Sequence, residues 1–153
     1  MIKIIAIGKI KEKPMQQIID EFAKRLKPIH QVVMVELPNS NKKENEVSAI
    51  LYDESTRILE KIEPKEFVVL LDLKGKDLSS VEMSQKIMGV LDQSLNVSFV
   101  VGGSHGVDDR VRERSNMRWR ISNLTFPHQL VRVMLYEQLY RFFMIAKGHP
   151  YHK

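Results

Sequence analysis

The sequence predicts an α/β protein with a mostly parallel sheet and helices on both faces. Short β-branched runs alternate along the chain with longer segments of helical periodicity, a pattern typical of parallel sheets connected by helices. The run EFVVLLDLKGK, residues 66–76, is apolar enough to be covered on both faces, as strands of parallel sheets are. A glycine-rich turn, VVGGSHG at residues 100–106, follows a later apolar run, where an α/β fold places its ligand.

Three strands and two helices are predicted in the first half of the chain. Residues 1–10, MIKIIAIGKI, form a β-branched strand closed by Gly8, and Pro14 suits the first turn of the helix that follows. Apolar residues at helical spacing continue this helix up to Pro28. The remaining elements are a strand in QVVMVELP, a polar loop in NSNKKENE, a helix over residues 47–62 that Pro64 stops, and the strand at residues 66–76.

The second half contains three helices and two strands. Ser79 and Glu82 form a capping box, which predicts a helix that carries Met83, Ile87 and Leu91. The elements that follow are a strand in NVSFVVGG, a short charged helix in DDRVRERS, a strand in RWRISN and a final helix from Pro127 to about Lys147. We expect the whole chain, residues 1–153, to form one domain.

The composition limits both the chemistry and the partners of the protein. The chain has no cysteine, which excludes disulfides, thiol nucleophiles and cysteine-ligated zinc, and no spacing of histidines and carboxylates favours another metal site. Its 24 Lys and Arg against 19 Asp and Glu give a net charge of +5, which favours a polyanionic partner. No apolar run is long enough for a signal sequence or a membrane span, so we expect a soluble, cytoplasmic protein.

The glycine-rich turn does not fit the two commonest phosphate-binding patterns. A dinucleotide-binding fold needs G-x-G-x-x-G after the first strand, but Gly8 stands alone there, and the chain has no G-K-[ST] of a P-loop. Two interpretations of Gly102, Gly103 and Gly106 are open: they let a ligand approach the backbone, or they only turn the chain. A second irregular stretch, residues 122–127, precedes an apolar helix, and two such loops together favour one ligand site.

Six stretches spread over nearly the whole chain carry a family resemblance: IKIIAIGKIK, LDLKGK, VVGGSHG, LTFPHQLVRV, EQLYRF and HPYHK. With these stretches the sequence resembles the SPOUT methyltransferases and, among them, the small single-domain family of ribosomal RNA large-subunit methyltransferase H. The resemblance implies a SPOUT-type trefoil-knotted domain, in which the C-terminal part threads through an earlier loop, and a pocket for S-adenosyl-L-methionine. It also implies a homodimer that methylates N3 of a pseudouridine in large-subunit (23S) ribosomal RNA.

The resemblance also assigns cofactor-binding residues by position. They are Leu71, Gly102, Ile121, Ser122, Asn123, Leu124, Thr125 and Phe126. The apolar members suit the flat adenine ring, and backbone groups beside them would bind its polar edge. Ordinary core packing is the alternative for the leucines and Phe126.

Arg141, Tyr151 and His152 are the catalytic candidates. The pseudouridine N3 must lose a proton before it attacks a methyl group, and His152 is the candidate base because histidine titrates near neutrality. The family's corresponding arginine suggests that Arg141 contacts RNA phosphate or the target base, whereas an ion pair with Glu137 is the alternative. By hypothesis Tyr151 and His152 complete the site, across a dimer, and a frayed tail is the alternative.

Two groups of basic residues are candidates for RNA phosphate binding. The first group lies between residues 110 and 120 and consists of Arg110, Arg112, Arg114, Arg118 and Arg120, where nearby acids also allow self-pairing. The second, weaker group is Lys3, Lys9, Lys11 and Lys13. Because the chain has no separate RNA-binding domain, we expect the substrate to be the assembled ribosome.

Two other functions are open at the level of sequence. A non-catalytic RNA- or ribosome-binding module needs only the basic charge and predicts no affinity for S-adenosyl-L-methionine. A different α/β enzyme would use Asp72, at the end of a predicted strand, as an acid or base. His128, at the start of the final helix, is interpreted as a satisfied structural histidine rather than as a base.

Overall fold

A five-stranded sheet with the order β2-β1-β4-β3-β5 organises the computed structural model, which describes all residues from 1 to 153. Its strands are β1 (Ile2–Ile7), β2 (Val32–Leu37), β3 (Phe67–Asp77), β4 (Val97–Val101) and β5 (Met117–Arg120). Each neighbouring pair is parallel, which confirms the predicted sheet type. All five carboxyl ends therefore lie at one edge of the sheet.

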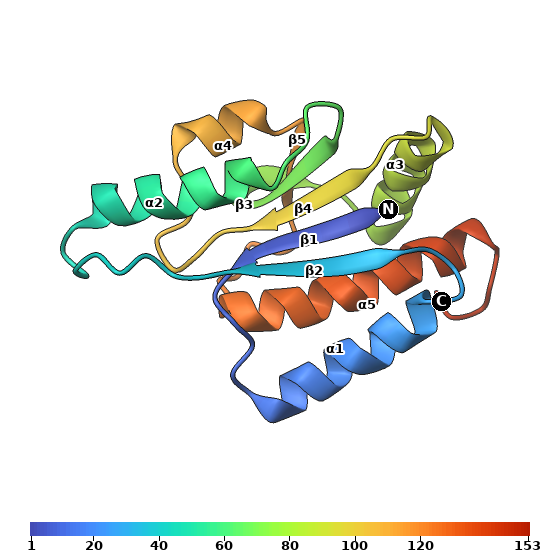
Figure 1. Cartoon of the computed structure of the whole chain (residues 1–153). Coiled ribbons are helices and arrows are strands. Elements are labelled where there is room, and N and C mark those ends of the chain that lie inside the picture. The colour runs from blue at the N-terminus through green and yellow to red at the C-terminus, as the bar shows by residue number, and fades with distance from the viewer.

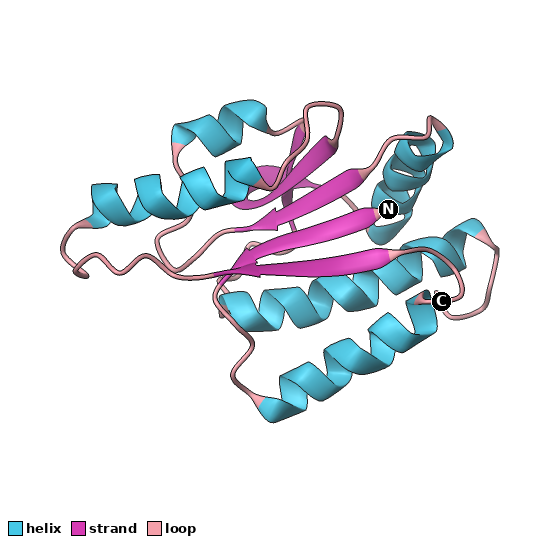
Figure 2. Cartoon of the chain, viewed as in Figure 1, coloured by secondary structure: helices cyan, strands magenta, loops and turns pink.

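Helices cover both faces of the sheet, as predicted (Figures 1 and 2). One face carries α1 (Lys13–Leu26), α3 (Ser80–Asp92) and α5 (His128–Ala146), and the other carries α2 (Val47–Glu60) and α4 (Asp109–Arg114). No helix combines the length and the apolar character that crossing a bilayer requires.

The local signals in the sequence explain where the elements begin and end. Pro14 lies in the first turn of α1, and Ser79 caps α3 through the expected capping box with Glu82. Several predicted boundaries differ from the structure: β1 and α2 end earlier than predicted, and the last strand ends at Arg120 rather than continuing to Asn123. The reason for the last difference is that β5 pairs only with β3, whose last residue, Asp77, is the partner of Arg120.

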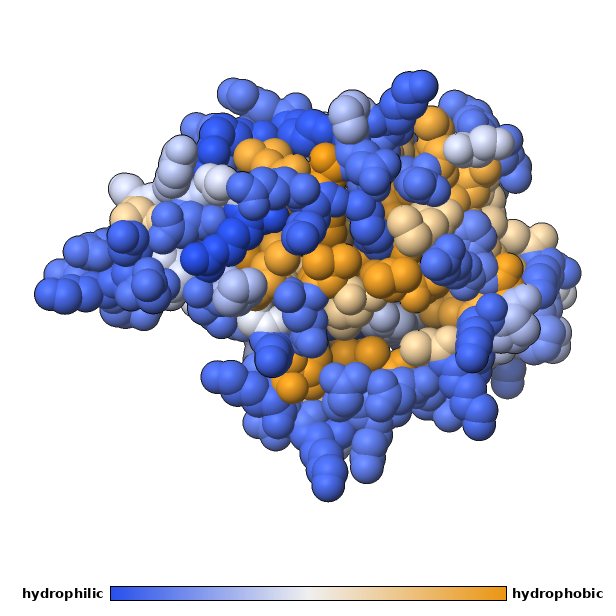
Figure 3. All heavy atoms as spheres, in the orientation of Figure 1, coloured by the Kyte–Doolittle hydropathy of each residue, from blue (hydrophilic) through white to orange (hydrophobic).

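Apolar side chains form one core on each face of the sheet. The larger core lies between the sheet and α1, α3 and α5 and contains Phe99, Trp119, Leu135 and Phe142. The smaller core lies beneath α2 and α4. Figure 3 shows mainly hydrophilic residues on the surface, including the projecting β2–α2 connection, and a band of apolar atoms between them.

The most deeply buried charged side chain is that of Arg132 on α5, which has no exposed surface. Its Nη2 donates a 2.7 Å hydrogen bond to the carbonyl oxygen of Ile7 at the end of β1, and its Nη1 pairs with Glu36 on β2 at 3.0 Å. Burial lowers the pKa of Arg132, and Glu36 opposes that shift. An arginine starts so far above neutrality that it remains charged. The two contacts therefore tie the start of α5 to the carboxyl edge of the sheet.

Replacing Arg132 with methionine (Arg132→Met) removes both contacts while keeping a long, unbranched side chain. We expect the free energy of unfolding to fall by about 3 kcal/mol, because Glu36 and the Ile7 carbonyl are left without their partner. Urea denaturation measures this change. The control is Arg118→Met, since Arg118 is exposed, and there we expect a change within about 0.5 kcal/mol. Equal destabilisation in the two variants would contradict the anchoring role.

Candidate functional site

A cleft of about 590 Å³ opens at the carboxyl edge of the sheet. Three chain segments converge on it: the end of β3, the glycine-rich turn after β4, and the connection from β5 into α5. Its lining consists of residues 70–74, 101–107, 120–122 and 124–128, together with Arg112 and Val131. This position is the one expected of a ligand site in a parallel α/β sheet, and the volume is that of a typical small-molecule site, about 300–1,000 Å³.

An irregularity in β3 forms one wall of the cleft. Leu71 and Lys76 of β3 are both registered with Trp119 of β5, so the four residues between them leave the ladder. Asp72 stabilises this bulge, because its Oδ1 accepts a 2.9 Å hydrogen bond from the backbone N–H of Lys74. The carboxylate that the sequence offers as an acid or base thus shapes the backbone at the cleft.

The glycine-rich turn forms the second wall, and the chain packs on itself there too tightly for side chains. A Cβ on Gly102 would lie 3.0 Å from the carbonyl carbon and oxygen of Gly106, and one on Gly103 would lie 2.6 Å from Oε1 of Glu54. Gly106 itself has φ +82°, in the left-handed region. The packing of these glycines is explained by the interpretation that they turn the chain. The turn also lines the cleft, so the interpretation that they let a ligand approach stays open.

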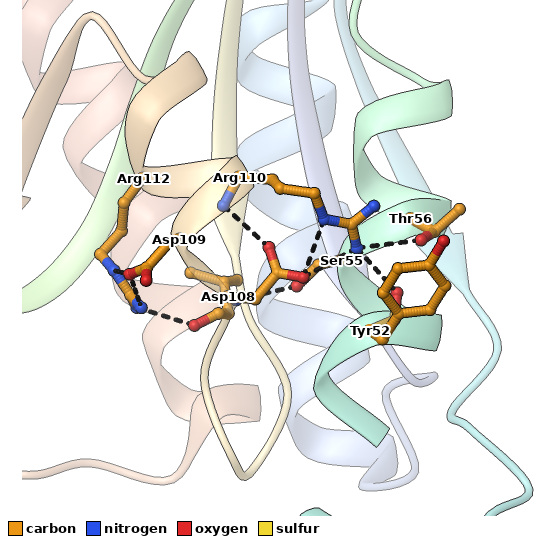
Figure 4. Close-up of polar contacts among 8 residues, drawn as sticks. Tyr52, Ser55, Thr56, Asp108, Asp109, Arg110 and Arg112 are labelled. Carbon is orange, nitrogen blue, oxygen red and sulfur yellow. Dashed lines mark hydrogen bonds and ion pairs between the residues drawn. The ribbon is translucent and has the colours of Figure 1, made fainter. Parts of the chain in front are cut away.

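Polar contacts between α2 and α4 fix the residues that follow the turn (Figure 4). The backbone N–H of Asp108 donates to Oγ of buried Ser55 at 2.9 Å, and Arg110 bridges Asp108 to Thr56. Arg112 donates to the carbonyl oxygen of Val107 at 2.7 Å. The turn is therefore held at a fixed position relative to both helices.

The third wall contains most of the residues assigned to the cofactor. Seven of the eight line the cleft: Leu71, Gly102, Ile121, Ser122, Leu124, Thr125 and Phe126. Asn123 is exposed outside the lining, and its Oδ1 accepts a 2.8 Å hydrogen bond from Arg120. Leu124 is 67% exposed, so core packing does not explain its side chain. Aliphatic side chains and the ring of Phe126 together give this part of the cleft an apolar lining, which suits a small-molecule ligand.

His128 begins α5 and lines the cleft. No hydrogen bond from a protein group reaches its ring, which differs from the expectation of a satisfied structural histidine. Burial lowers the pKa of His128, the nearby Arg132 lowers it further, and Glu54 opposes both effects. These effects together favour the neutral form of the ring.

The three catalytic candidates form a cluster at the other end of α5. Arg141 donates to Oε1 of Glu137 at 2.9 Å, which is the predicted ion pair, and its Nη1 lies 3.1 Å from Nδ1 of His152. Tyr151 donates to the same Glu137 oxygen at 2.9 Å, and the Arg141 guanidinium stacks 4.8 Å from the Tyr151 ring centre. The hydrogen bond to Glu137 raises the pKa of Arg141, and burial raises the pKa of Tyr151. The tail is docked on α5 rather than frayed.

The cleft and this tail cluster are far apart within one chain. Arg141 follows His128 by thirteen residues on one helix, which corresponds to about 20 Å along the axis. An apolar groove of about 400 Å³ lies between them, lined by Ile18 and Phe22 of α1, Val133 and Met134 of α5, and further residues that include Ile121 and Glu137. Ile121 also belongs to the cleft and Glu137 to the tail cluster, so the groove joins the two.

Four of the five clustered arginines are engaged within the protein. Arg110, Arg112 and Arg120 pair with Asp108, Asp109 and Asp77, and Arg114 donates to the backbone carbonyls of Glu63, Pro64 and Glu66. The self-pairing alternative, with acids of the same segment, holds for Arg110 and Arg112, whereas Arg114 and Arg120 bind groups elsewhere in the chain. Of the predicted lysine group, Lys3 also pairs, with buried Glu66 at 2.6 Å. No group of three or more histidines and carboxylates lies in a metal-binding arrangement.

Sequence reasoning missed several residues that shape the site. Glu54 is buried beneath Gly103. The helical pattern of the sequence gives no sign of this, because it marks residue 54 only as a polar position. Arg112 holds the glycine-rich turn. The only hint of this in the sequence is weak: Arg112 stands three residues after Asp109, a spacing that allows an ion pair on one helix face. The burial of Arg132 had one signal in the sequence. The residues on both sides of it are apolar and predict a helix that is covered on several sides, so a charged residue within it is expected to be buried as well.

Comparison with known proteins gives concordant results. A family model described as predicted SPOUT methyltransferase matches residues 1–152. Proteins named ribosomal RNA large subunit methyltransferase H are similar over 99% of both chains: those of Carboxydothermus hydrogenoformans, Enterococcus faecalis and Clostridium botulinum (strain 657) are 42%, 43% and 44% identical, respectively.

Replacing Gly102 with alanine tests the packing of the turn. We expect Gly102→Ala to lower the free energy of unfolding by about 1–3 kcal/mol, because the backbone of Gly106 must move away from the new methyl group. The matched control is Gly89→Ala in α3, where a Cβ meets nothing within 4 Å. There a helical alanine should add about 0.5–1 kcal/mol of stability. Urea denaturation of both variants measures the difference, and a neutral Gly102→Ala would contradict the tight turn.

Proposed function

The chain belongs to the SPOUT methyltransferase family, and from this premise we propose that it transfers a methyl group from S-adenosyl-L-methionine to N3 of a pseudouridine in large-subunit ribosomal RNA. The names of relatives that align over nearly the full length support a ribosomal RNA substrate. The observation that carries the proposal is the cleft at the carboxyl edge, formed by a glycine-rich turn and a second irregular loop. The family also implies the trefoil knot.

Residues around the cleft fit the proposed cofactor. Leu71, Ile121, Leu124 and Phe126 would surround the apolar faces of adenine, while backbone groups of residues 121–126 would bind its polar edge. Gly102 leaves the backbone beside the cleft bare of a side chain. When bound, S-adenosyl-L-methionine supplies an electrophilic methyl group on a sulfonium.

The protein's contribution to the reaction is alignment, exclusion of water and removal of a proton. The target N3 is a weak imide acid, and a neutral histidine is the appropriate acceptor of its proton. We assign this role to His152, with Arg141 positioned to bind phosphate or the target base and Tyr151 to support both. His128 lines the cleft and is the second candidate for the base.

A homodimer would bring the tail cluster to a cleft. Within one chain the cluster lies about 20 Å along α5 from the start of that helix, too far to act there. The apolar groove connects the two places, and Ile18 is 45% exposed beside it. A second copy bound across this groove by twofold symmetry would place the tail of each subunit near the cleft of the other. We therefore propose that the active site is shared between subunits.

The remaining features of the proposal concern the chain as a whole. We propose that residues 1–153 act as one domain in the cytoplasm, where ribosomes are found. The structure consists of one sheet and the helices that cover it, and a unit of this size offers little surface for reading an RNA sequence. The assembled ribosome is therefore the proposed substrate.

The first test is transfer of a labelled methyl group from S-adenosyl-L-methionine to ribosomes, separated subunits and free RNA from cells that lack the enzyme. We expect label at one pseudouridine of large-subunit RNA, and fastest in assembled ribosomes. Cofactor binding without transfer to any of these would contradict the substrate. Absence of cofactor binding would overturn the proposal in favour of a non-catalytic binding module.

The shared site is tested by mixing two inactive variants. Deletion of residues 150–153 and Gly102→Val should each abolish transfer, because one removes the tail and the other fills the glycine-rich turn. When the two variants are mixed and allowed to exchange subunits, half of the dimers should contain one chain of each kind. In such a dimer one of the two sites combines the intact cleft of one chain with the intact tail of the other, and the second site lacks both. Activity should then return to about a quarter of the wild-type value. If each site belonged to one chain, mixing would restore no activity.

A further inference from the structure

The connection between β1 and α1, together with the first residue of α1, carries three lysines, Lys9, Lys11 and Lys13, which we call the lysine loop. All three residues are exposed, and none takes part in an ion pair. Glu12 is the one acidic residue among them. The lysine loop therefore presents a local excess of positive charge that no other part of the chain neutralises, unlike the engaged arginines between residues 110 and 120.

The backbone of the lysine loop is held in place by hydrogen bonds. Gly8 donates to the carbonyl oxygen of Leu37 at 2.6 Å, and Ile10 donates to Oε2 of Glu36 at 2.9 Å. The same Glu36 oxygen pairs with buried Arg132. The loop is thus connected to the most buried charge in the protein, and its lysines project from a fixed position rather than from a mobile segment.

A further hydrogen bond places the lysine loop beside the cleft. The backbone N–H of Lys11 donates to Oε1 of Gln129 at 3.0 Å. Gln129 is the second residue of α5 and directly follows Pro127 and His128, which both line the cleft. Figure 1 shows the β1–α1 connection passing the start of α5. The backbone of the lysine loop at Lys11 therefore lies beside the start of α5, next to residues that line the cleft.

We infer that the lysine loop is a phosphate-binding surface for the ribosomal RNA substrate, an inference that rests on the proposed function. An ammonium group is a compact point charge that binds a phosphate oxygen without requiring a fixed orientation. Contacts of this kind position a nucleic acid without reading its sequence. The lysine loop would hold the backbone next to the target nucleotide, while the cleft and the tail select the base.

The test compares two triple variants with the same change in net charge. Lys9, Lys11 and Lys13 are replaced by glutamine in one, and Lys61, Lys65 and Lys86 in the other. The control lysines lie at the amino edge of the sheet: Lys61 follows α2, Lys65 precedes β3, and Nζ of Lys86 lies 5.5 Å from the ring centre of Phe67, the first residue of β3. Affinity for ribosomes from cells lacking the enzyme is measured over a series of salt concentrations, and affinity for S-adenosyl-L-methionine is measured separately.

We expect the lysine-loop variant to bind ribosomes about 10–100-fold more weakly at low salt. The slope of log K against log salt should fall by about 1 for each phosphate that the variant no longer binds. Its affinity for the cofactor should be unchanged, and arginines at the three positions should restore ribosome binding. The control variant should bind within about threefold of the wild type.

Two results would overturn the inference: equal weakening in both variants, which indicates a general effect of net charge, or an unchanged salt slope in the lysine-loop variant. Failure of the proposed function itself is distinguishable from these, because in that case the wild-type protein would methylate no ribosomal RNA at all.

Discussion

The buried guanidinium of Arg132 is the contact on which the geometry of the candidate site depends. It joins α5 to the last residue of β1 and, through Glu36, to β2 and the β1–α1 connection. These elements come from distant parts of the sequence, and α5 is the one among them that borders the cleft. A hydrophobic side chain at this position would bury as much surface but would not fix the direction of α5, because apolar contacts are non-directional. The charged contact therefore determines where the first turn of α5 lies.

The walls of the cleft are determined by contacts of the chain with itself. The bulge in β3 follows from its register against β5, and the glycine-rich turn follows from the close approach of Gly102 to Gly106 and of Gly103 to Glu54. Residues of these segments make up a large part of the lining of the cleft. A ligand bound mainly by backbone groups tolerates changes in loop side chains, provided that the glycines and the register are kept.

The elements of the fold could be predicted from the sequence because their signals are local. The capping box at Ser79, the proline in the first turn of α1 and the apolar run of β3 each depend on neighbouring residues. The end of β5, the burial of Glu54 and the pairing of the arginines depend on distant partners, and local pattern does not contain that information. The trefoil knot that the family implies is of the same kind, since a knot is a property of the whole path of a chain and is nearly absent from other folds.

Helix α5 connects all parts of the proposed mechanism, and its length is the reason for proposing a site shared between two chains. Its first turn borders the cleft, its second turn carries Arg132, and its last turns hold Glu137 and Arg141 with the docked tail. A straight helix keeps its two ends apart, so no change of side-chain conformation brings Arg141 to the cleft of its own subunit. In the proposed dimer, twofold symmetry across the groove would remove this separation without bending the helix, because each subunit would supply the end that the other lacks. The same arrangement would leave the lysine loop of each subunit beside its own cleft.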